Sequence, residues 1–197
     1  MGHMGHASAA ARVAALYDIH GNLPALEAVL RAVRNAGVDL IVVGGDVIPG
    51  PMPRQTLEYL LHLNIPRHFI VGNGELAVLA QIGVRAADVT YWGTTSGHPL
   101  SAAVQEQMRW NADQIRSDYE ATLRSWSKTI RISIDGLGEV LFCHGTPRSK
   151  VECVTKLTPE AQLVPVLQEI GAELVVCGHT HMQFDRMIGS VRMRTGC

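Results

Sequence analysis

Short apolar runs separated by polar segments are the clearest pattern along this chain. Five runs have the length and composition of buried β-strands, and they span residues 13–17, 40–43, 68–71, 140–142 and 174–177. Between the first three, apolar positions recur with helical spacing. One predicted helix opens at Asn22 and stops at Gly37, and the next starts near Pro53 and ends before Pro66. Crossovers of this length join parallel strands, so the pattern predicts a β-α-β-α-β unit.

The pattern changes between residues 80 and 127, where β-branched runs are few. Two amphipathic helical patterns occur there, at about residues 100–109 and 111–126. We therefore expect a cap-like helical insertion at about residues 83–127, lying over or beside a functional site. Trp110 and Trp126 have the spacing to pack these helices onto the core.

The strand pattern resumes after the insertion with two predicted hairpins and a helix between them. The hairpins pair residues 129–134 with 140–142 and residues 184–188 with 191–194. The helix has Pro159 at its first position, where a missing N–H costs nothing. Strands alternating with helices indicate the α/β class.

Length and composition fit one globular domain. Of 197 residues 47% are hydrophobic, and no apolar run approaches the roughly 18 residues that a membrane helix needs. We expect residues 1–8 to be a cloning remnant or disordered, with a single domain over residues 9–197. The four cysteines show no C-x-x-C spacing, and Cys143 and Cys177 lie in apolar runs, so we expect buried thiols and a cytoplasmic setting.

Each apolar run is followed directly by a short polar motif. The motifs are Asp18-Ile19-His20-Gly21-Asn22, Gly44-Gly45-Asp46, Gly72-Asn73-Gly74-Glu75, Cys143-His144-Gly145 and Gly178-His179-Thr180-His181. On an extended strand end, residues i and i+2 point the same way, so Asp18 and His20 can hold one ion together. Any single motif is more often a loop feature than a ligand pair. Five of them at strand ends would be costly in a core without a metal, so the set predicts a site for one or two divalent cations.

The ordered motifs resemble the calcineurin-like metallophosphoesterase superfamily, and the first resembles its small bacterial and archaeal phosphodiesterase-type members. The resemblance covers about residues 12–194. It implies a four-layer α/β/β/α sandwich with the site at the strand ends. It also implies hydrolysis of a phosphodiester or phosphomonoester, possibly a nucleotide, by a water or hydroxide that bridges two metal ions.

Carried over by position, the resemblance implies two sets of metal ligands that share one aspartate. One ion would be held by Asp18, His20, Asp46 and His181, and the other by Asp46, Asn73, His144 and His179. Oxygen and nitrogen ligands of this kind suit several divalent metals. We expect two Mn²⁺ ions, with Fe, Zn, Co or Ni also compatible.

Three further residues are candidates for contacts with substrate. Asn22 can bind a phosphate oxygen, cap the following helix, or do both. Arg148 can clamp a phosphate, although its position is somewhat more typical of a solvent-exposed arginine without a role. Many relatives have a histidine where this chain has Gly74, and that histidine protonates the leaving alcohol. We hypothesise that His98, in the insertion, supplies the proton instead, and that Glu75 orients a ligand or caps a helix.

The net charge of the chain indicates which classes of partner it can bind. The formal charge of −1 argues against a dedicated nucleic-acid binder, and a nuclease is the weakest hypothesis. A small phosphorylated substrate fits, with no membrane partner, and the oligomeric state stays open. The alternative function is a catalytically weak or inactive scaffold of the same fold that binds a protein. The C-terminus at Cys197 can belong to a short member or to a truncated one that exposes a sheet edge.

Overall fold

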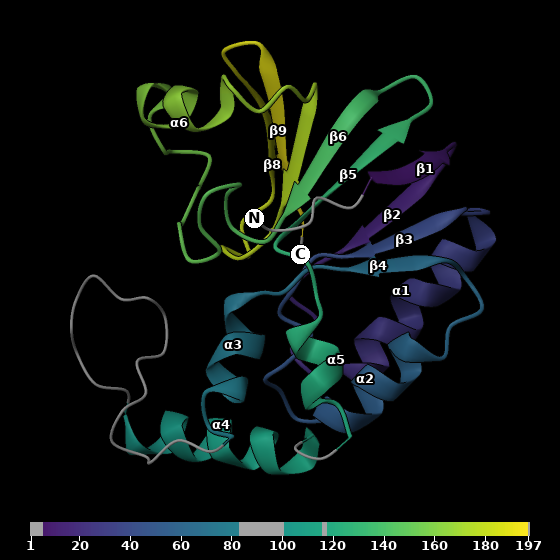
Figure 1. Ribbon diagram of the computed structural model, residues 1–197, viewed down its shortest axis with the longest axis vertical. Helices are drawn as coiled ribbons and strands as arrows, with labels where there is room; N and C mark the ends of the chain where they lie inside the picture. Colours follow the sequence, from purple (N-terminus) through teal and green to yellow (C-terminus); the bar gives the residue numbers. More distant parts are fainter. Residues whose placement is uncertain (1–5, 83–100, 116–117, 197) are drawn as a thin grey trace.

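The computed structural model describes residues 6–82, 101–115 and 118–196, and its strands form two sheets (Figure 1). The smaller sheet is parallel, with the order β2-β3-β4. The larger sheet has the order β1-β5-β6-β7-β9-β8 and mixes parallel and antiparallel pairs. The strands are β1 (His6–Ala10), β2 (Val13–Leu16), β3 (Leu40–Val43), β4 (Arg67–Phe69), β5 (Thr129–Ile134), β6 (Gly138–Cys143), β7 (Leu174–Cys177), β8 (Phe184–Ile188) and β9 (Val191–Thr195).

Helices cover the outer face of each sheet, which gives the four layers that the resemblance implied (Figure 1). Five helices lie on the side of the small sheet, and α6 (Glu160–Leu167) covers the large one. The five are α1 (Leu23–Asn35), α2 (Pro53–Leu61), α3 (Asn73–Leu79), α4 (Ala102–Ile115) and α5 (Glu120–Arg124). Both predicted hairpins are confirmed as the antiparallel pairs β5–β6 and β8–β9.

Strand β3 shows how the layers are built. All four of its residues are buried, because the strand lies between helices on one face and the second sheet on the other. Ile41 and Val43 pack into the core beneath the helices, whereas Val42 packs into the core between the sheets. Side chains alternate across a strand, so this uninterrupted apolar run feeds two cores at once.

One expectation about the segments needs correction and another stays a prediction. Residues 6–8 belong to β1, which pairs in parallel with β5, and that residues 1–8 are a cloning remnant stays a prediction. In the insertion, α4 runs without interruption through the break expected near residue 110. It packs against α2 and α3, so the part of the insertion that the structure describes extends the helical layer.

The two tryptophans of the insertion behave differently from each other. Trp126 is buried and its ring stacks on Phe69 with a centroid separation of 4.7 Å, as expected for packing onto the core. Trp110 is 45% exposed, so its predicted packing role is wrong. It lies on the face of α4 opposite the buried residues Met108 and Ala112. Those smaller side chains, and not Trp110, pack the helix onto the core.

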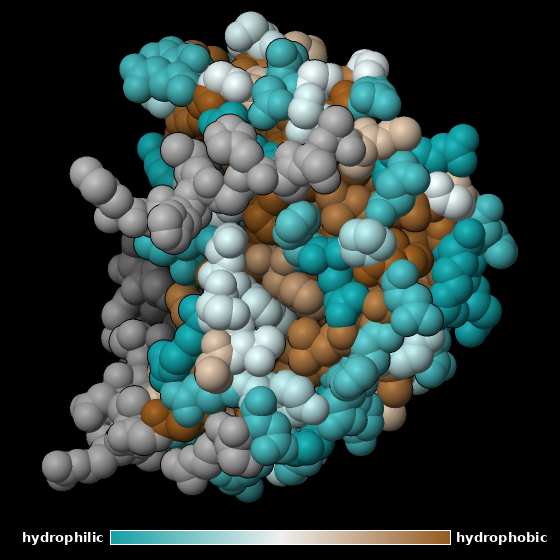
Figure 2. Space-filling model, turned by 45° about the vertical axis from the view of Figure 1, so that its right-hand side comes forward, coloured by the Kyte–Doolittle hydropathy of each residue, from teal (hydrophilic) through white to brown (hydrophobic). Residues whose placement is uncertain are grey.

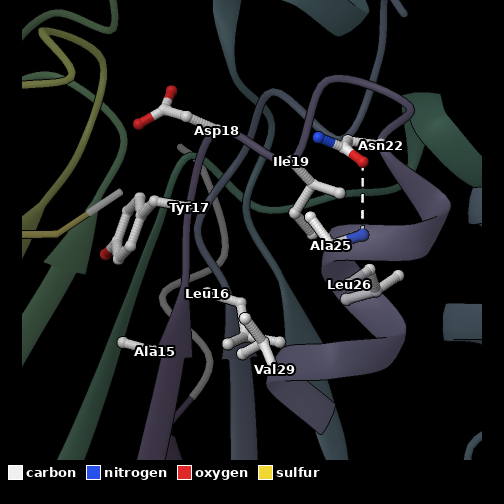
Figure 3. A pocket seen from close by; sticks show the side chains of 9 residues that line it. All are labelled: Ala15, Leu16, Tyr17, Asp18, Ile19, Asn22, Ala25, Leu26 and Val29. Atoms are coloured by element: carbon white, nitrogen blue, oxygen red, sulfur yellow. Dashed lines mark hydrogen bonds between the residues drawn. The ribbon is translucent and has the colours of Figure 1, made fainter. Parts of the chain in front are cut away.

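Strand β2 is an edge strand of the small sheet. A cavity of about 320 Å³ lies on each face of this strand. The first lies between β2 and α1; Asp18 and Asn22 are at one end and Ala15 and Val29 at the other (Figure 3). The second lies between the sheets. Apolar side chains also gather across the middle of the face shown in Figure 2, with hydrophilic residues around them. Within the described ranges, no helix is long and apolar enough to cross a bilayer.

Candidate metal centre

Five of the predicted metal ligands share an unusual backbone conformation. Asp18, His20, Asp46, His179 and His181 all have positive φ, between 48° and 72°. They are the only non-glycine residues with positive φ in the part of the chain that the structure describes. This conformation costs roughly 1–3 kcal/mol per residue and persists where surrounding contacts fix it, as happens at functional sites.

Hydrogen bonds between two of the motifs hold this backbone in place. The Asp18 N–H donates to Gly45 O at 3.1 Å, and the His20 N–H donates to Asp46 O at 2.9 Å. The loop after β2 therefore lies directly on the loop after β3. The extended conformation that we expected for the Asp18–His20 pair is wrong, but the left-handed turns still bring both side chains to one place.

The ligands gather into two groups that could each hold a metal ion. Asp18, His20 and His181 form one, and the buried residues Asp46, His144 and His179 form the other. The candidate ligand atoms within each group lie within 4.8 Å of one another. Both groups combine the two sheets, because the histidines after β6 and β7 face acids from the loops after β2 and β3.

Asp46 lies between the two groups. Its Oδ2 is 3.8 Å from Nε2 of His20, and its Oδ1 is 3.4 Å from Nε2 of His144. Asn73, the predicted amide ligand, places Oδ1 3.0 Å from the same His144 nitrogen. All seven predicted ligands are thus brought together, with one carboxylate oxygen of Asp46 toward each group.

Backbone carbonyls orient two of the imidazoles. Nδ1 of His20 lies 3.1 Å from Pro49 O, and Nδ1 of His144 lies 3.0 Å from Gly44 O. A ring nitrogen that faces a carbonyl oxygen donates its proton to it, so Nδ1 of each ring is the donor and Nε2 is the nitrogen that can bind a metal ion once it is deprotonated. Fixing the tautomer in this way is what metal-binding histidines require.

The donor set fits a divalent cation. The Asp18 side chain is 1% exposed, yet its Oδ1 accepts no hydrogen bond, and Nε2 of His181 is 3.6 Å away. A buried carboxylate oxygen without a partner is expensive unless a cation completes it. The other oxygen, Oδ2, accepts the backbone N–H of His179 at 2.9 Å, which aims Oδ1 at the ligand group.

At each of these groups, burial and the neighbouring charges have opposing effects on the pKa. Burial raises the pKa of Asp18. Burial also works against charge on His144, but the hydrogen bond and negative charge of Asp46 outweigh it and raise the pKa of His144 to about 9. A proton and a metal ion therefore compete for Nε2 of His144, so metal binding releases a proton.

Glu75 fixes the loop that carries Asp46 by hydrogen bonds to its backbone. It is fully buried, and its two carboxylate oxygens accept four backbone N–H groups, from Asp46, Val47, Ile48 and Gly72, at 2.7–3.2 Å. Burial and the charge of Asp46 raise the pKa of Glu75 to about 7. Both predicted roles of Glu75 are present, since it caps α3 and fixes the loop that carries Asp46.

The glycine at position 74 has a steric reason. Its N–H donates to Asp46 Oδ1 at 2.6 Å. A Cβ atom there would lie 2.2 Å from Ile48 O and 2.8 Å from the Pro49 ring, both well inside contact distance. No larger side chain fits without moving the loop after β3, so this backbone does not accommodate an imidazole at position 74.

A family comparison agrees with this geometry. Residues 11–183 match the model of the calcineurin-like phosphoesterase family. The chain belongs to that family.

Relatives of this chain include an uncharacterized protein, MJ0912, from Methanocaldococcus jannaschii. It is 28% identical over 173 residues, which are 87% of this chain and 63% of the relative, so the chain spans less than two thirds of that protein. Among solved structures, hypothetical protein PH1004 from Pyrococcus horikoshii OT3 has a TM-score of 0.75 at 15% identity, over 95% of this chain and 75% of its own. A metallophosphoesterase from Sphaerobacter thermophilus has a TM-score of 0.62 at 24% identity, over 94% and 76%. These likenesses show the fold.

The three residues predicted to contact substrate have different outcomes. Asn22 caps α1, because its Oδ1 accepts the Ala25 N–H at 3.2 Å, and its second role stays a prediction (Figure 3). Arg148 is exposed and pairs with Glu152, whose carboxylate accepts its Nε–H at 2.8 Å. Its contact with substrate also stays a prediction. His98 lies outside the described residues.

One supporting residue escaped the sequence analysis. Tyr17 is buried, and its hydroxyl donates to Val176 O at 2.9 Å, which ties the end of β2 to β7 in the other sheet. Burial raises its pKa well above the ordinary value. Gly44 and Gly178 leave room for the ring, since a Cβ at either would lie within 2.6 Å of it. Glycine directly after two apolar runs was the available signal.

Proposed function

We propose that this protein hydrolyses phosphate esters at a dinuclear metal site, with a phosphodiester, a phosphomonoester or a nucleotide as substrate. The observation that carries the proposal is the position of Asp46, which directs one carboxylate oxygen toward each of two ligand groups. Two divalent cations, when bound, supply Lewis-acid chemistry that activates water and neutralises charge on the phosphoryl group.

The chain's own residues determine where that chemistry can occur. Asp18, His20 and His181 would hold one cation, while Asn73, His144 and His179 would hold the other with Asp46 shared. The backbone carbonyls behind His20 and His144 fix their rings, so little reorganisation accompanies binding. Asn22 stands at the N-terminus of α1, where its amide group and the helix N–H groups favour an anion.

The leaving group should matter unusually much. In this proposal the four histidines of the site bind metal, and position 74 has no room for a fifth histidine that could protonate the leaving group. Esters whose leaving group departs as a stable anion, such as aryl esters or phosphoanhydrides, need little protonation and should react best. For alkyl esters we propose that His98 donates the proton. A His98→Ala variant assayed on aryl phosphates of rising leaving-group pKa should lose progressively more activity along the series, and equal losses would contradict this role.

We propose that Mn²⁺ is the activating ion and that the substrate is a small phosphorylated molecule. Mixed oxygen and nitrogen ligands also accept Fe, Zn, Co and Ni, so metal identity needs measurement. Purified protein treated with a chelator should lose hydrolysis of bis(4-nitrophenyl) phosphate and regain it with Mn²⁺. Two metal ions bound per chain without hydrolysis of any phosphomonoester, phosphodiester or dinucleotide would overturn the proposal and favour a scaffold that binds a protein partner.

A further inference from the structure

Two lysines lie beside the His144 end of the metal centre. Lys128 directly precedes β5, and the β5–β6 register pairs Thr129 with Cys143, so Lys128 comes opposite His144. On its other side, Ser127 accepts the Val71 N–H at 2.9 Å, just before the Asn73 motif. Lys128 is therefore placed between the strand end that carries His144 and the one that carries Asn73.

Lys150 reaches the same place from the loop after β6. A tight turn, in which the Thr146 N–H donates to Ser149 O at 2.7 Å, folds the chain back over Gly145. The Lys150 backbone comes so close that a Cβ on Gly145 would lie 3.0 Å from Lys150 O. The Lys150 backbone thus lies against Gly145, the residue that follows His144, in a turn that needs glycine at position 145.

The backbones of both lysines lie beside the His144 motif, that of Lys128 across the β5–β6 register and that of Lys150 against Gly145, and neither lysine forms an ion pair with a described carboxylate. Burial lowers the pKa of Lys150, and the positive charge of Lys128 lowers it further, against the attraction of Glu75. Glu75 is committed to four backbone N–H groups, and Glu152, the acid in the same loop, is paired with Arg148. Between described residues, the ion pairs involve arginines and histidines but neither of these lysines.

Two like charges held together without a counter-charge are unfavourable in the protein alone, and an anion between them removes the repulsion. We propose that Lys128 and Lys150 form a cationic subsite beside Asn73 and His144 that binds a second anionic group of the substrate. This proposal rests on the proposed function and sharpens it. The favoured substrates are phosphate esters or anhydrides that carry a further phosphate a few ångströms from the scissile one.

Binding to the Mn²⁺-loaded protein tests the subsite without turnover. Methylenediphosphonate carries two phosphonate groups and is not hydrolysed, while methylphosphonate carries one and serves as the matched ligand. For Lys150→Met, we expect methylenediphosphonate affinity to fall about tenfold in calorimetric titration, with methylphosphonate affinity within about twofold of wild type. Lys150→Arg keeps the charge and should retain most of the affinity. Arg31→Met, which removes an exposed charge from α1, should change neither ligand.

Three outcomes separate the proposals. A selective loss of methylenediphosphonate binding in Lys150→Met, increased in the Lys128→Met/Lys150→Met double variant, supports the subsite. Equal losses for both ligands, or none, overturn it, and wild-type hydrolysis of 4-nitrophenyl phosphate would then leave the proposed function standing. Selective binding without any wild-type hydrolysis would retain the anion subsite and overturn the proposed function.

Discussion

The backbone N–H of Gly74 donates a 2.6 Å hydrogen bond to Oδ1 of Asp46, the oxygen that faces His144. This bond places the start of α3 against the loop after β3. It also explains why the residue after Asn73 has no side chain, since Ile48 O and the Pro49 ring fill the space where a Cβ would be. The geometry of Asp46 therefore depends on a glycine in another motif.

Gly74→Ala should destabilise the protein by about 1–3 kcal/mol, because the added methyl group overpacks a tight contact. It should also lower metal content, since relief of the clash moves the N–H away from Asp46. Urea unfolding and metal analysis measure the two effects. Gly136→Ala, at a turn with open space around it and a φ of 77°, is the control for backbone strain alone and should keep its metal. Unchanged stability of Gly74→Ala would contradict the steric explanation.

Asp46→Asn should abolish hydrolysis and reduce bound metal to one ion or fewer. The amide keeps the shape of the side chain but offers only one oxygen, so it cannot serve both ligand groups. We expect activity to fall by at least about a hundredfold, beyond the range typical of supporting residues. Metal per chain by mass spectrometry is the measurement. Two tightly bound ions in this variant would show that Asp46 does not bridge them.

Glu75→Gln should weaken the site without touching substrate. A glutamine keeps one acceptor oxygen but turns an NH₂ group toward backbone N–H donors, which should cost about 2–4 kcal/mol of unfolding free energy. Metal affinity should fall about 10–100-fold, because the Asp46 loop loses its support. Glu106→Gln, on the exposed face of α4, controls for loss of one charge. Loss of stability with unchanged metal affinity would limit Glu75 to capping α3.

Asn22 can be separated into its two roles with a pair of variants. Asn22→Ser keeps a cap acceptor, so its stability should stay within about 0.5 kcal/mol of wild type, whereas Asn22→Ala should lose about 1 kcal/mol. If the amide also binds phosphate, KM for an aryl phosphate should rise in both variants by a similar factor. An unchanged KM in Asn22→Ser would leave only the cap.

Tyr17→Phe should reduce stability and spare catalysis. The change leaves Val176 O without its buried donor, which should cost about 1–2 kcal/mol. Because the ring still fills the space between Gly44 and Gly178, kcat and metal content should match wild type. Thermal unfolding measures the loss. A large fall in kcat would instead indicate that the link between the sheets positions the metal ligands.

Local sequence patterns sufficed for much of the fold. The apolar run at β3 and the hairpin β8–β9 were predictable because strand alternation and turn residues act over a few positions. The N-terminus of α1 was equally accessible, since Asn22 caps it through a bond to a residue three positions away. In the insertion the same reasoning was wrong, because it predicted a break inside α4. The helix runs through that position, and Met108 and Ala112 on either side of it are both buried.

The sequence alone determined which side chains are candidates for the metal centre, because ligand chemistry resides in residue type and the order of the motifs is specific. Only the tertiary structure decided how they meet: Asp46 between two groups, Glu75 beneath four N–H groups, and Lys150 beside Lys128. Apart from Glu75 and Gly72, those relations join residues from 22 to 98 positions apart. They depend on how two sheets pack face to face, which no local pattern encodes.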